Sequence, residues 1–385
     1  MPILFVHGVA SRIKNGHDKT WATVQNNLRT IVAPQISKYG RGDNVWIEEA
    51  YWGDAAVDFG DLRLSLPTPE RIRELQSRKS GWLERKFQEF ENLPNTLEDL
   101  PNTLKFAQNF FSKAPEKLWD LPGYQLTRHV SEPFRPKLNQ ETTLFLGDIF
   151  HYLSRRGEVN NLGAITSELL SKLKEAHKNK RQRDNEPLIV ISHSMGGQLV
   201  YDMVTHYLPE MAKLPQHQDC QNIHIDFWVA AGSQVGLFKE MKVFKEDINS
   251  RQASLPAPFP SKHLGIWWNL WDSNDYLSFT VAPFVEGVFD DMYDSGKSAI
   301  TSHTAHFEDK DFYQELALHI SNAQKSDWKR KDFMKNLTME HWEHSQLVEQ
   351  TAKISRNRSP NVTSLNSLSS WSSLDSSDYE VLTDD

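Results

Sequence analysis

Ser194 has the sequence surroundings of a catalytic nucleophile. It lies in the run S-H-S-M-G-G at residues 192–197, which follows the apolar run Leu188–Ile191 and precedes apolar residues at helical spacing. A serine at a sharp strand-to-helix turn is typical of a nucleophile elbow, and the turn needs small residues two positions before and after it. Ser192 and Gly196 occupy those positions, although glycine is more usual at the first. The pattern predicts a nucleophile at the end of a buried strand.

A serine nucleophile requires a base and a group that orients the base. A neutral histidine can take the hydroxyl proton during attack, and a carboxylate holds the imidazole in the required tautomer. Asp272 and Asp275 follow the apolar run Leu264–Trp271, at the edge of a parallel sheet where catalytic groups gather. His303 and His306 come later in the chain. The residues thus offer two candidates for the acid and two for the base.

Acyl transfer also requires donors for a developing oxyanion. The backbone N–H of Met195 is the first candidate because it directly follows the nucleophile. Val9 is the second because it follows His7 and Gly8 at the end of the first apolar run. No His or acidic residues fall into a metal-ligand pattern with partners, so we expect neither a metal nor a cofactor.

The elements that must position these residues alternate between strands and helices. Short apolar runs predict strands at Ile3–Val6, Val45–Trp52, Leu188–Ile191, Ile223–Ala231, Leu264–Trp271 and Val285–Tyr293. Apolar residues at helical spacing predict helices at Trp21–Tyr39, Phe145–Leu153 and Leu162–His177. The same spacing predicts one helix that begins directly after the elbow and another over residues 309–320. Residues 10–20 read as a loop. This alternation predicts an α/β fold with a mostly parallel sheet and helices on both faces.

Residues 61–137 interrupt this alternation. They form a string of polar helical patterns that carry aromatic residues and are separated by prolines. We predict a helical insertion, or cap, in a hydrolase domain that spans residues 1–325. Two interpretations stay open: the aromatic residues pack the cap on the core, or they form a lid face that contacts a membrane surface or a partner.

The C-terminal part of the chain differs in composition from the rest. Residues 326–350 can hold one more helix, whereas residues 351–385 are rich in Ser and Asp and poor in large apolar residues. Such a segment cannot bury enough apolar surface to fold alone, so we predict a disordered tail. It is either a solvated tail or a docking segment for a protein partner.

Composition limits the class of protein. The net charge of −8 argues against nucleic acid as a partner. The single cysteine, Cys220, excludes an internal disulfide framework and fits a reducing compartment. The N-terminal apolar run is too short for a signal peptide, and no run of about 18 apolar residues could span a membrane. We therefore expect a cytoplasmic protein.

Several of these residues together resemble the α/β-hydrolases, and most closely the lipase-like serine esterases. The resemblance rests on the run V-H-G-V at residues 6–9, on the elbow at residues 192–197, and on Asp275 and His303 later in the chain. The runs Q-L-V-Y-D at residues 198–202 and N-L-W-D-S-N-D at residues 269–275 are also similar to that family. In the second pattern the last aspartate is catalytic, which implies Asp275 in preference to Asp272. The family's Ser-His pattern before the last helix implies His303 in preference to His306.

We therefore predict a serine hydrolase that cleaves a carboxylic ester through an acyl-enzyme. The resemblance implies a lipid-like substrate, while a phospholipid, a small ester, a thioester and an amide stay open. One alternative is a hydrolase-fold interaction protein whose site is vestigial. Another is a phospholipase-type toxin or defence effector, which would share the chemistry and differ in its substrate.

Overall fold

A computed structural model describes most of the predicted hydrolase domain. The described residues are 1–9, 11–13, 16–37, 45–58, 135–249, 256–297 and 302–337, with only the backbone described at 135–142. The chain divides into two units, Met1–Trp328 and Lys329–Asp385, and in the second unit residues 330–337 are helical. The predicted insertion up to residue 134, the rest of the predicted C-terminal helix and the predicted tail lie outside the described residues.

The first unit is built on a parallel sheet of six strands in the order β2-β1-β5-β6-β7-β8. The strands are β1 (Pro2–Val6), β2 (Trp46–Ala50), β5 (Ile189–His193), β6 (Ile225–Ala231), β7 (Leu264–Asp272) and β8 (Phe289–Tyr293). A two-stranded antiparallel pair, β3 (Gly157–Glu158) and β4 (Asn161–Leu162), lies apart from this sheet. Each of the six strands lies within or close to a segment that the sequence predicted, so the predicted α/β fold is confirmed.

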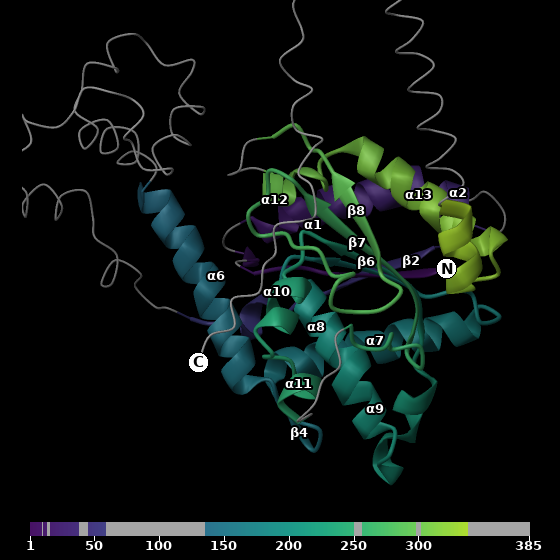
Figure 1. The fold of residues 1–385 in the computed structure, drawn as a ribbon, viewed down its shortest axis with the longest axis horizontal. Coiled ribbons are helices and arrows are strands. Elements are labelled where there is room, and N and C mark those ends of the chain that lie inside the picture. The colour runs from purple at the N-terminus through teal and green to yellow at the C-terminus, as the bar shows by residue number, and fades with distance from the viewer. Residues whose placement is uncertain are drawn as a thin grey trace, which may run out of the picture. The chain divides into compact units, whose positions relative to one another are not determined.

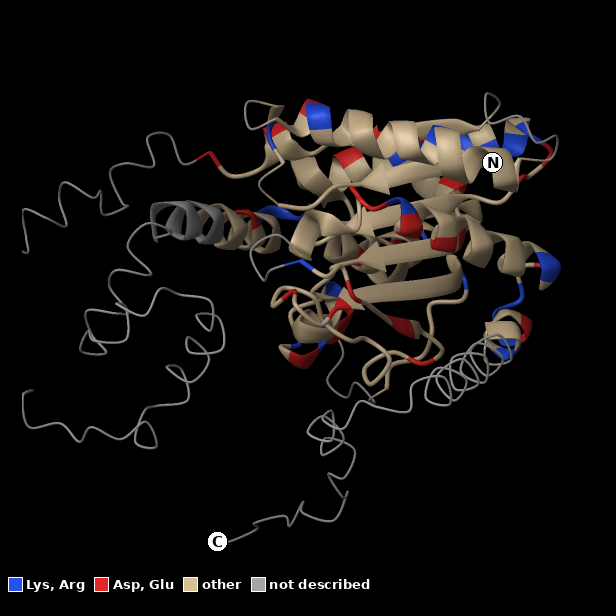
Figure 2. Cartoon of the chain, turned by 90° about the horizontal axis from the view of Figure 1, so that it is seen from above, with Lys and Arg blue, Asp and Glu red and all other residues tan. Residues whose placement is uncertain are grey.

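Helices cover both faces of the sheet (Figure 1). One face carries α1 (His17–Asn27), η2 (Leu28–Val32), α2 (Ala33–Ile36), α12 (Ser302–Ala305) and α13 (Lys310–Lys325). The other carries α6 (Arg135–Arg155), α7 (Ala164–Gln182), α8 (Gly196–Asp202), η8 (Met203–Tyr207), α9 (Leu208–Met211), α10 (Val235–Glu240) and α11 (Lys245–Asn249). Short 3-10 turns form at η4 (Gly53–Ala55) and η9 (Pro215–Asn222). Figure 2 shows many of the charged residues on the outer helices. Strands β1 and β5 carry no Lys, Arg, Asp or Glu, whereas the edge strands β2 and β8 carry two acidic residues each.

The pattern of burial explains why β5 becomes a central strand. Its apolar residues are buried on both sides because β1 and β6 flank it and helices cover both faces. A strand in such a position is expected to be a continuous apolar run, as Leu188–Ile191 is. All six strands run in one direction, so the carboxyl ends of β1, β5, β6 and β7 meet at one edge of the sheet. The loops at this edge carry the predicted site residues.

Two helices begin earlier in the chain than predicted. The first begins at His17, inside the predicted loop, and α6 already begins at Arg135, inside the predicted insertion.

Pro34 and Pro209 each follow a π-helical segment, η2 or η8. Because proline has no N–H and its ring crowds the preceding turn, a wider turn before it lets the helix continue. Among the described helices, none combines the length and the apolar character that crossing a membrane requires.

Candidate active site

Ser194 lies in a strained turn between β5 and α8. Its φ angle of 51° is in the left-handed region, which a residue with a side chain seldom adopts. The backbone N–H of Ser194 donates to the carbonyl oxygen of Ala231 at the end of β6, at 2.9 Å. A Cβ on Gly196 would lie 2.4 Å from the carbonyl oxygen of Val6, so no larger residue fits there. The elbow geometry that the sequence predicts is therefore present at this serine.

The serine at position 192, where glycine is more usual, has partners of its own. Its hydroxyl is buried and accepts a hydrogen bond from the indole N–H of Trp228 at 2.8 Å. The same hydroxyl donates to the carbonyl oxygen of Val229 at 3.3 Å. Because a buried hydroxyl is costly only when it lacks partners, Ser192 is tolerated at this crowded position.

The loop after β1 packs directly against the nucleophile. A Cβ on Gly8 would lie 2.6 Å from Cβ of Ser194. His7 fixes this loop, because its Nε2 accepts the backbone N–H of Trp52 at 2.9 Å and its Nδ1 donates to the carbonyl oxygen of Gly8 at 2.8 Å. Burial lowers the pKa of His7 to about 3, so the ring stays neutral and serves the fold. The partly buried Val9, one predicted oxyanion donor, directly follows this fixed segment.

The structure brings Asp275 and His303 together. Oδ2 of Asp275 lies 2.7 Å from Nδ1 of His303. Asp275 is buried on the loop after β7, and its other carboxylate oxygen accepts the backbone N–H of Leu277 at 2.9 Å. A carboxylate can only accept here, so the proton of a neutral His303 is on Nδ1 and Nε2 carries the lone pair that a base requires.

Two further contacts place His303 at the edge of the sheet. Nε2 of His193 lies 2.8 Å from the carbonyl oxygen of His303, and the two rings are 4.8 Å apart. The Ser302 hydroxyl donates to the carbonyl oxygen of Asn274 at 3.0 Å, which ties α12 to the loop of the acid. Burial, with the neighbouring His303 and His306, lowers the pKa of His193 well below its ordinary value. His193 is therefore neutral and acts as a hydrogen-bond donor that holds the backbone of His303.

Gly232 lies between the Asp275–His303 pair and Ser194. A Cβ there would lie 3.3 Å from Oδ2 of Asp275 and 3.5 Å from Nδ1 of His303. The preceding residue accepts the backbone N–H of Ser194. Nε2 of His303 has no hydrogen-bond partner among the described residues, and the Ser194 hydroxyl contacts Nε2 of Gln234 instead, at 3.4 Å. Ser194 and His303 thus lie at one end of β6 without a hydrogen bond between their side chains.

The alternative acid and base have other positions. Asp272 accepts the backbone N–H of Asn274 at 2.8 Å and that of Ser295 at 3.1 Å, so its carboxylate stabilises the turn after β7. His306 is buried and packs against Phe307, with ring centroids 4.3 Å apart. Burial lowers the pKa of His306 to about 3, with a smaller contribution from His303. Among the described residues, neither the Asp272 carboxylate nor the His306 ring makes a hydrogen bond to Asp275 or His303; Asp272 contacts Asp275 only through its backbone carbonyl, which accepts the N–H of Asp275 at 3.0 Å.

The buried neutral His306 predicts a loss of stability in acid. Its pKa is about 3 when folded and near 6.5 when unfolded, so below pH 6.5 the unfolded chain binds a proton that the folded chain excludes. Lowering the pH from 8 to 5 should therefore cost about 2 kcal/mol of unfolding free energy through this residue. His306→Phe should reduce the difference between urea unfolding at pH 8 and at pH 5 by that amount. An unchanged difference would contradict the assignment of a neutral buried ring.

A buried ion pair beside the site was not predicted from the sequence. The guanidinium of Arg12 makes two hydrogen bonds to the carboxylate of Asp148 on α6, at 2.6 and 3.2 Å. Arg12 also donates to the carbonyl oxygen of Val57 at 3.1 Å, and the N–H of Val57 donates to Asp148 at 3.2 Å. These contacts hold the loop after β1 to the two chain segments that flank the predicted insertion. Arg12 and Asp148 are 136 residues apart, so sequence spacing gives no signal for the pair.

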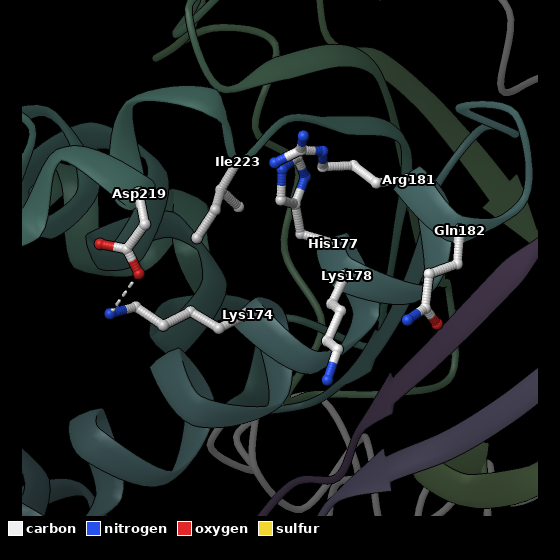
Figure 3. A pocket seen from close by; sticks show the side chains of 7 residues that line it. All are labelled: Lys174, His177, Lys178, Arg181, Gln182, Asp219 and Ile223. Carbon is white, nitrogen blue, oxygen red and sulfur yellow. Dashed lines mark ion pairs between the residues drawn. The ribbon is translucent and has the colours of Figure 1, made fainter.

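A basic hollow lies away from the candidate active site. It is lined by Lys174, His177, Lys178, Arg181, Gln182, Asp219 and Ile223, and Figure 3 shows the ion pair of 2.8 Å between Lys174 and Asp219. Five of these residues lie on α7, which precedes β5 in the chain. Asp219 lies on η9 and Ile223 directly follows it, shortly before β6 begins. They therefore lie at the amino edge of the sheet, opposite Ser194, and take no part in its chemistry.

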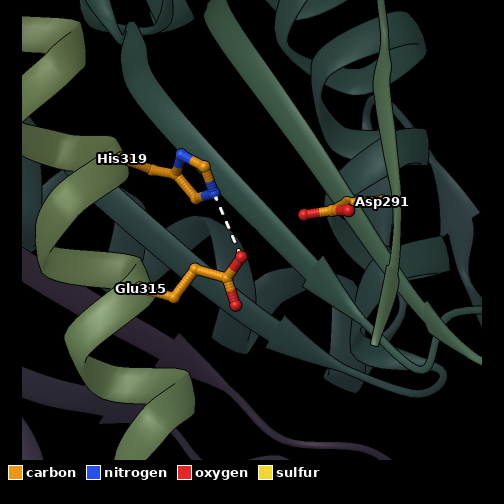
Figure 4. A group of neighbouring side chains, drawn as sticks. All are labelled: Asp291, Glu315 and His319. Carbon is orange, nitrogen blue, oxygen red and sulfur yellow. Dashed lines mark ion pairs between the residues drawn. The ribbon is translucent and has the colours of Figure 1, made fainter. Parts of the chain in front are cut away.

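One group of described side chains has the types that bind a divalent cation. Asp291 on β8 and Glu315 and His319 on α13 place one ligand atom each within 4.8 Å of the others (Figure 4). Nε2 of His319 lies 3.6 Å from Glu315, and the indole N–H of Trp268 donates to Asp291 at 3.3 Å. Because one of these residues lies on a strand and two lie on a helix, the group forms no metal-ligand spacing in the sequence. The sequence therefore led us to expect no metal. The His319 ring also packs against the ring of Phe289 on β8, with centroids 5.7 Å apart, so α13 contacts β8 without an ion.

The parallel sheet and the elbow define the class of protein. Comparison with family models adds a match of residues 164–257 to the family described as "Lecithin:cholesterol acyltransferase". The match covers α7, β5, the elbow and β6, and it ends before Asp275 and His303. No curated protein and no solved structure matches the chain. The chain is therefore a member of the α/β-hydrolase superfamily and an enzyme of the carboxylic ester hydrolase type.

Proposed function

We propose that the protein cleaves a carboxylic ester through an acyl-enzyme formed on Ser194, with His303 as the base and Asp275 as the group that orients it. The observation that carries this proposal is the 2.7 Å contact between Asp275 and His303 beside a serine with a φ angle of 51°. The lack of a hydrogen bond between the Ser194 hydroxyl and Nε2 of His303 is compatible with the proposal, because catalytic hydrogen bonds are often long or poorly aligned before substrate binds.

The proposed reaction has two steps. Ser194 Oγ attacks the ester carbonyl while Nε2 of His303 accepts its proton, and the backbone N–H groups of Val9 and Met195 stabilise the oxyanion. The imidazolium then donates this proton to the leaving alcohol. In the second step His303 takes a proton from water, which attacks the acyl-enzyme carbonyl. The bond between the acyl carbon and Oγ then breaks, His303 returns the proton to Oγ, and the acid and the free serine are released. Each oxyanion donor contributes about 3 kcal/mol to such a transition state.

The substrate is proposed to be lipid-like. The support is the match of the elbow region to a family whose name describes the transfer of an acyl group from lecithin to cholesterol. That name also suggests a second outcome, in which an acceptor alcohol replaces water in the second step. Adding a sterol to the assay would separate the two, since only an acyltransferase would form the new ester.

The test of the proposal is labelling with a fluorophosphonate probe, followed by mass spectrometry of the labelled peptide. The folded protein should be labelled on Ser194, because the probe reacts with activated serines. Ser194→Ala and heat-denatured protein should show no label. A series of nitrophenyl esters of increasing acyl length would then show whether activity rises toward lipid-like chains. A folded wild-type protein that takes no label would refute the proposed activity.

A further inference from the structure

Gln234 is a buried residue that contacts the nucleophile and was not singled out in the sequence. It is fully buried and lies directly before α10, three residues after the end of β6. Its Nε2 donates toward the Ser194 hydroxyl at 3.4 Å and to the carbonyl oxygen of Gly232 at 2.9 Å. It also donates to the carbonyl oxygen of Leu277, on the loop of the acid. The amide carries two hydrogens, so the Ser194 hydroxyl at 3.4 Å shares one of them with a carbonyl oxygen in a weaker three-centre contact. One side chain thus joins the nucleophile, the end of β6 and the acid loop.

The orientation of the Gln234 amide is fixed by its neighbours. Its Oε1 accepts a hydrogen bond from Nε2 of Gln198 at 2.7 Å, so this atom must be an oxygen. A flipped amide would direct its oxygen at the two carbonyl oxygens of Gly232 and Leu277, which cannot donate. The NH₂ group of Gln234 is therefore the group that faces Ser194.

Gln198 supports this arrangement from the elbow helix α8. It is fully buried, and its own Oε1 has no hydrogen-bond partner among the described residues. A buried polar atom without a partner destabilises a fold, typically by about 1–3 kcal/mol. Gln198 thus holds the Gln234 amide in this orientation at a cost in stability.

We propose that Gln234 is a positioning residue that holds Oγ of Ser194 for transfer of its proton to His303. This inference rests on the proposed function of Ser194. A hydroxyl that accepts a hydrogen bond from Gln234 has its lone pair occupied on that side, so its own proton is free to point to another acceptor. His303 lies at the same end of β6, beside Gly232, and Nε2 of its ring is the nearby group that requires a proton donor.

The role of Gln234 differs from that of an oxyanion donor. Its NH₂ group contacts the hydroxyl of the serine itself, whereas Val9 and Met195 are the donors for the substrate oxygen. Gln234 therefore restricts the rotation of the nucleophile about its Cα–Cβ bond. Because Gln234 also donates to Leu277, the acid loop and the nucleophile keep their relative position through one side chain.

The experiment compares Gln234→Met, which keeps the shape and removes the donor, with wild-type protein. Both are measured for the rate of fluorophosphonate labelling and for kcat and KM with a nitrophenyl ester. The labelling rate and kcat should each fall about 100-fold, because a misplaced reacting atom costs about that much, while KM should change less than about threefold. Gln324→Met is a control remote from the site: Gln324 is an exposed glutamine on α13 whose amide donates weakly to the carbonyl oxygen of Ile36, at 3.5 Å. It should leave both rates unchanged.

A second variant separates positioning from a structural role. Gln234→Glu retains a donor only when its carboxyl group is protonated, so its labelling rate relative to wild type should rise as the pH falls. The ratio for Gln234→Met should stay constant with pH. Wild-type labelling together with unchanged or faster labelling of Gln234→Met would overturn the inference and leave the proposed function standing. Absence of labelling in wild-type protein would overturn the proposed function itself.

Discussion

Asp275→Asn should lower kcat about 10⁴-fold while the protein stays folded. The carboxylate of Asp275 accepts the Nδ1 proton of His303 at 2.7 Å, and so selects the tautomer whose Nε2 is a base. An asparagine amide can instead donate to Nδ1, which stabilises the opposite tautomer and places the proton on Nε2. That ring cannot accept the proton of Ser194. The measurement is kcat with a nitrophenyl ester, with far-ultraviolet circular dichroism to show that the fold is intact.

Asp272→Asn is the matched control for this substitution. Asp272 lies three residues earlier, at the end of β7, but its carboxylate accepts backbone N–H groups from Asn274 and Ser295. An asparagine oxygen can accept one of these, so activity should fall by less than about tenfold, mainly through a looser turn. A larger loss for Asp272→Asn than for Asp275→Asn would reverse the assignment of the acid.

The main parts of the fold could be predicted because each depends on local sequence. A buried parallel strand must be an apolar run, and Leu188–Ile191 is such a run. The elbow at Ser194 requires small neighbours, and residues 192–197 supply them. The loops at the carboxyl edge collect polar groups, which directed attention to Asp272 and Asp275, and the family resemblance then implied Asp275. These rules act within a few residues of the chain, so one sequence is sufficient to apply them.

Contacts between distant segments could not be predicted in this way. Gln234 follows a predicted strand at the carboxyl edge, so the rule that selected Asp275 would have included it, yet nothing in its sequence indicates the partner Gln198. Arg12 and Asp148 likewise pair across 136 residues. Neither residue type has a periodic pattern that specifies its partner. Such contacts depend on how complete elements pack, which only the three-dimensional arrangement supplies.

Asp202→Asn should lower the free energy of unfolding by about 3–5 kcal/mol. Asp202 is fully buried at the end of α8, where it accepts from Nη1 of Arg156 at 2.7 Å, from the hydroxyl of Tyr152 at 2.9 Å and from the N–H of Lys245 at 2.9 Å. Burial, with the nearby Asp202 carboxylate, raises the pKa of Tyr152 well above its ordinary value, so its hydroxyl remains a donor. A neutral amide would leave the guanidinium of Arg156 buried without a counter-charge. Urea unfolding followed by tryptophan fluorescence measures the loss.

Two comparisons determine whether the loss arises from an unpaired buried charge. Asp219→Asn removes an ion pair with Lys174 of similar length, 2.8 Å, but the Asp219 side chain is 56% exposed, so that loss should stay below about 1 kcal/mol. Adding Arg156→Met to Asp202→Asn removes the stranded charge and should restore part of the lost stability. If the double variant is as unstable as the sum of the two single variants, the cost lies in lost packing around α6 and α8. Recovery would show that the loss arises from the stranded charge of Arg156 and not from lost packing around α6 and α8.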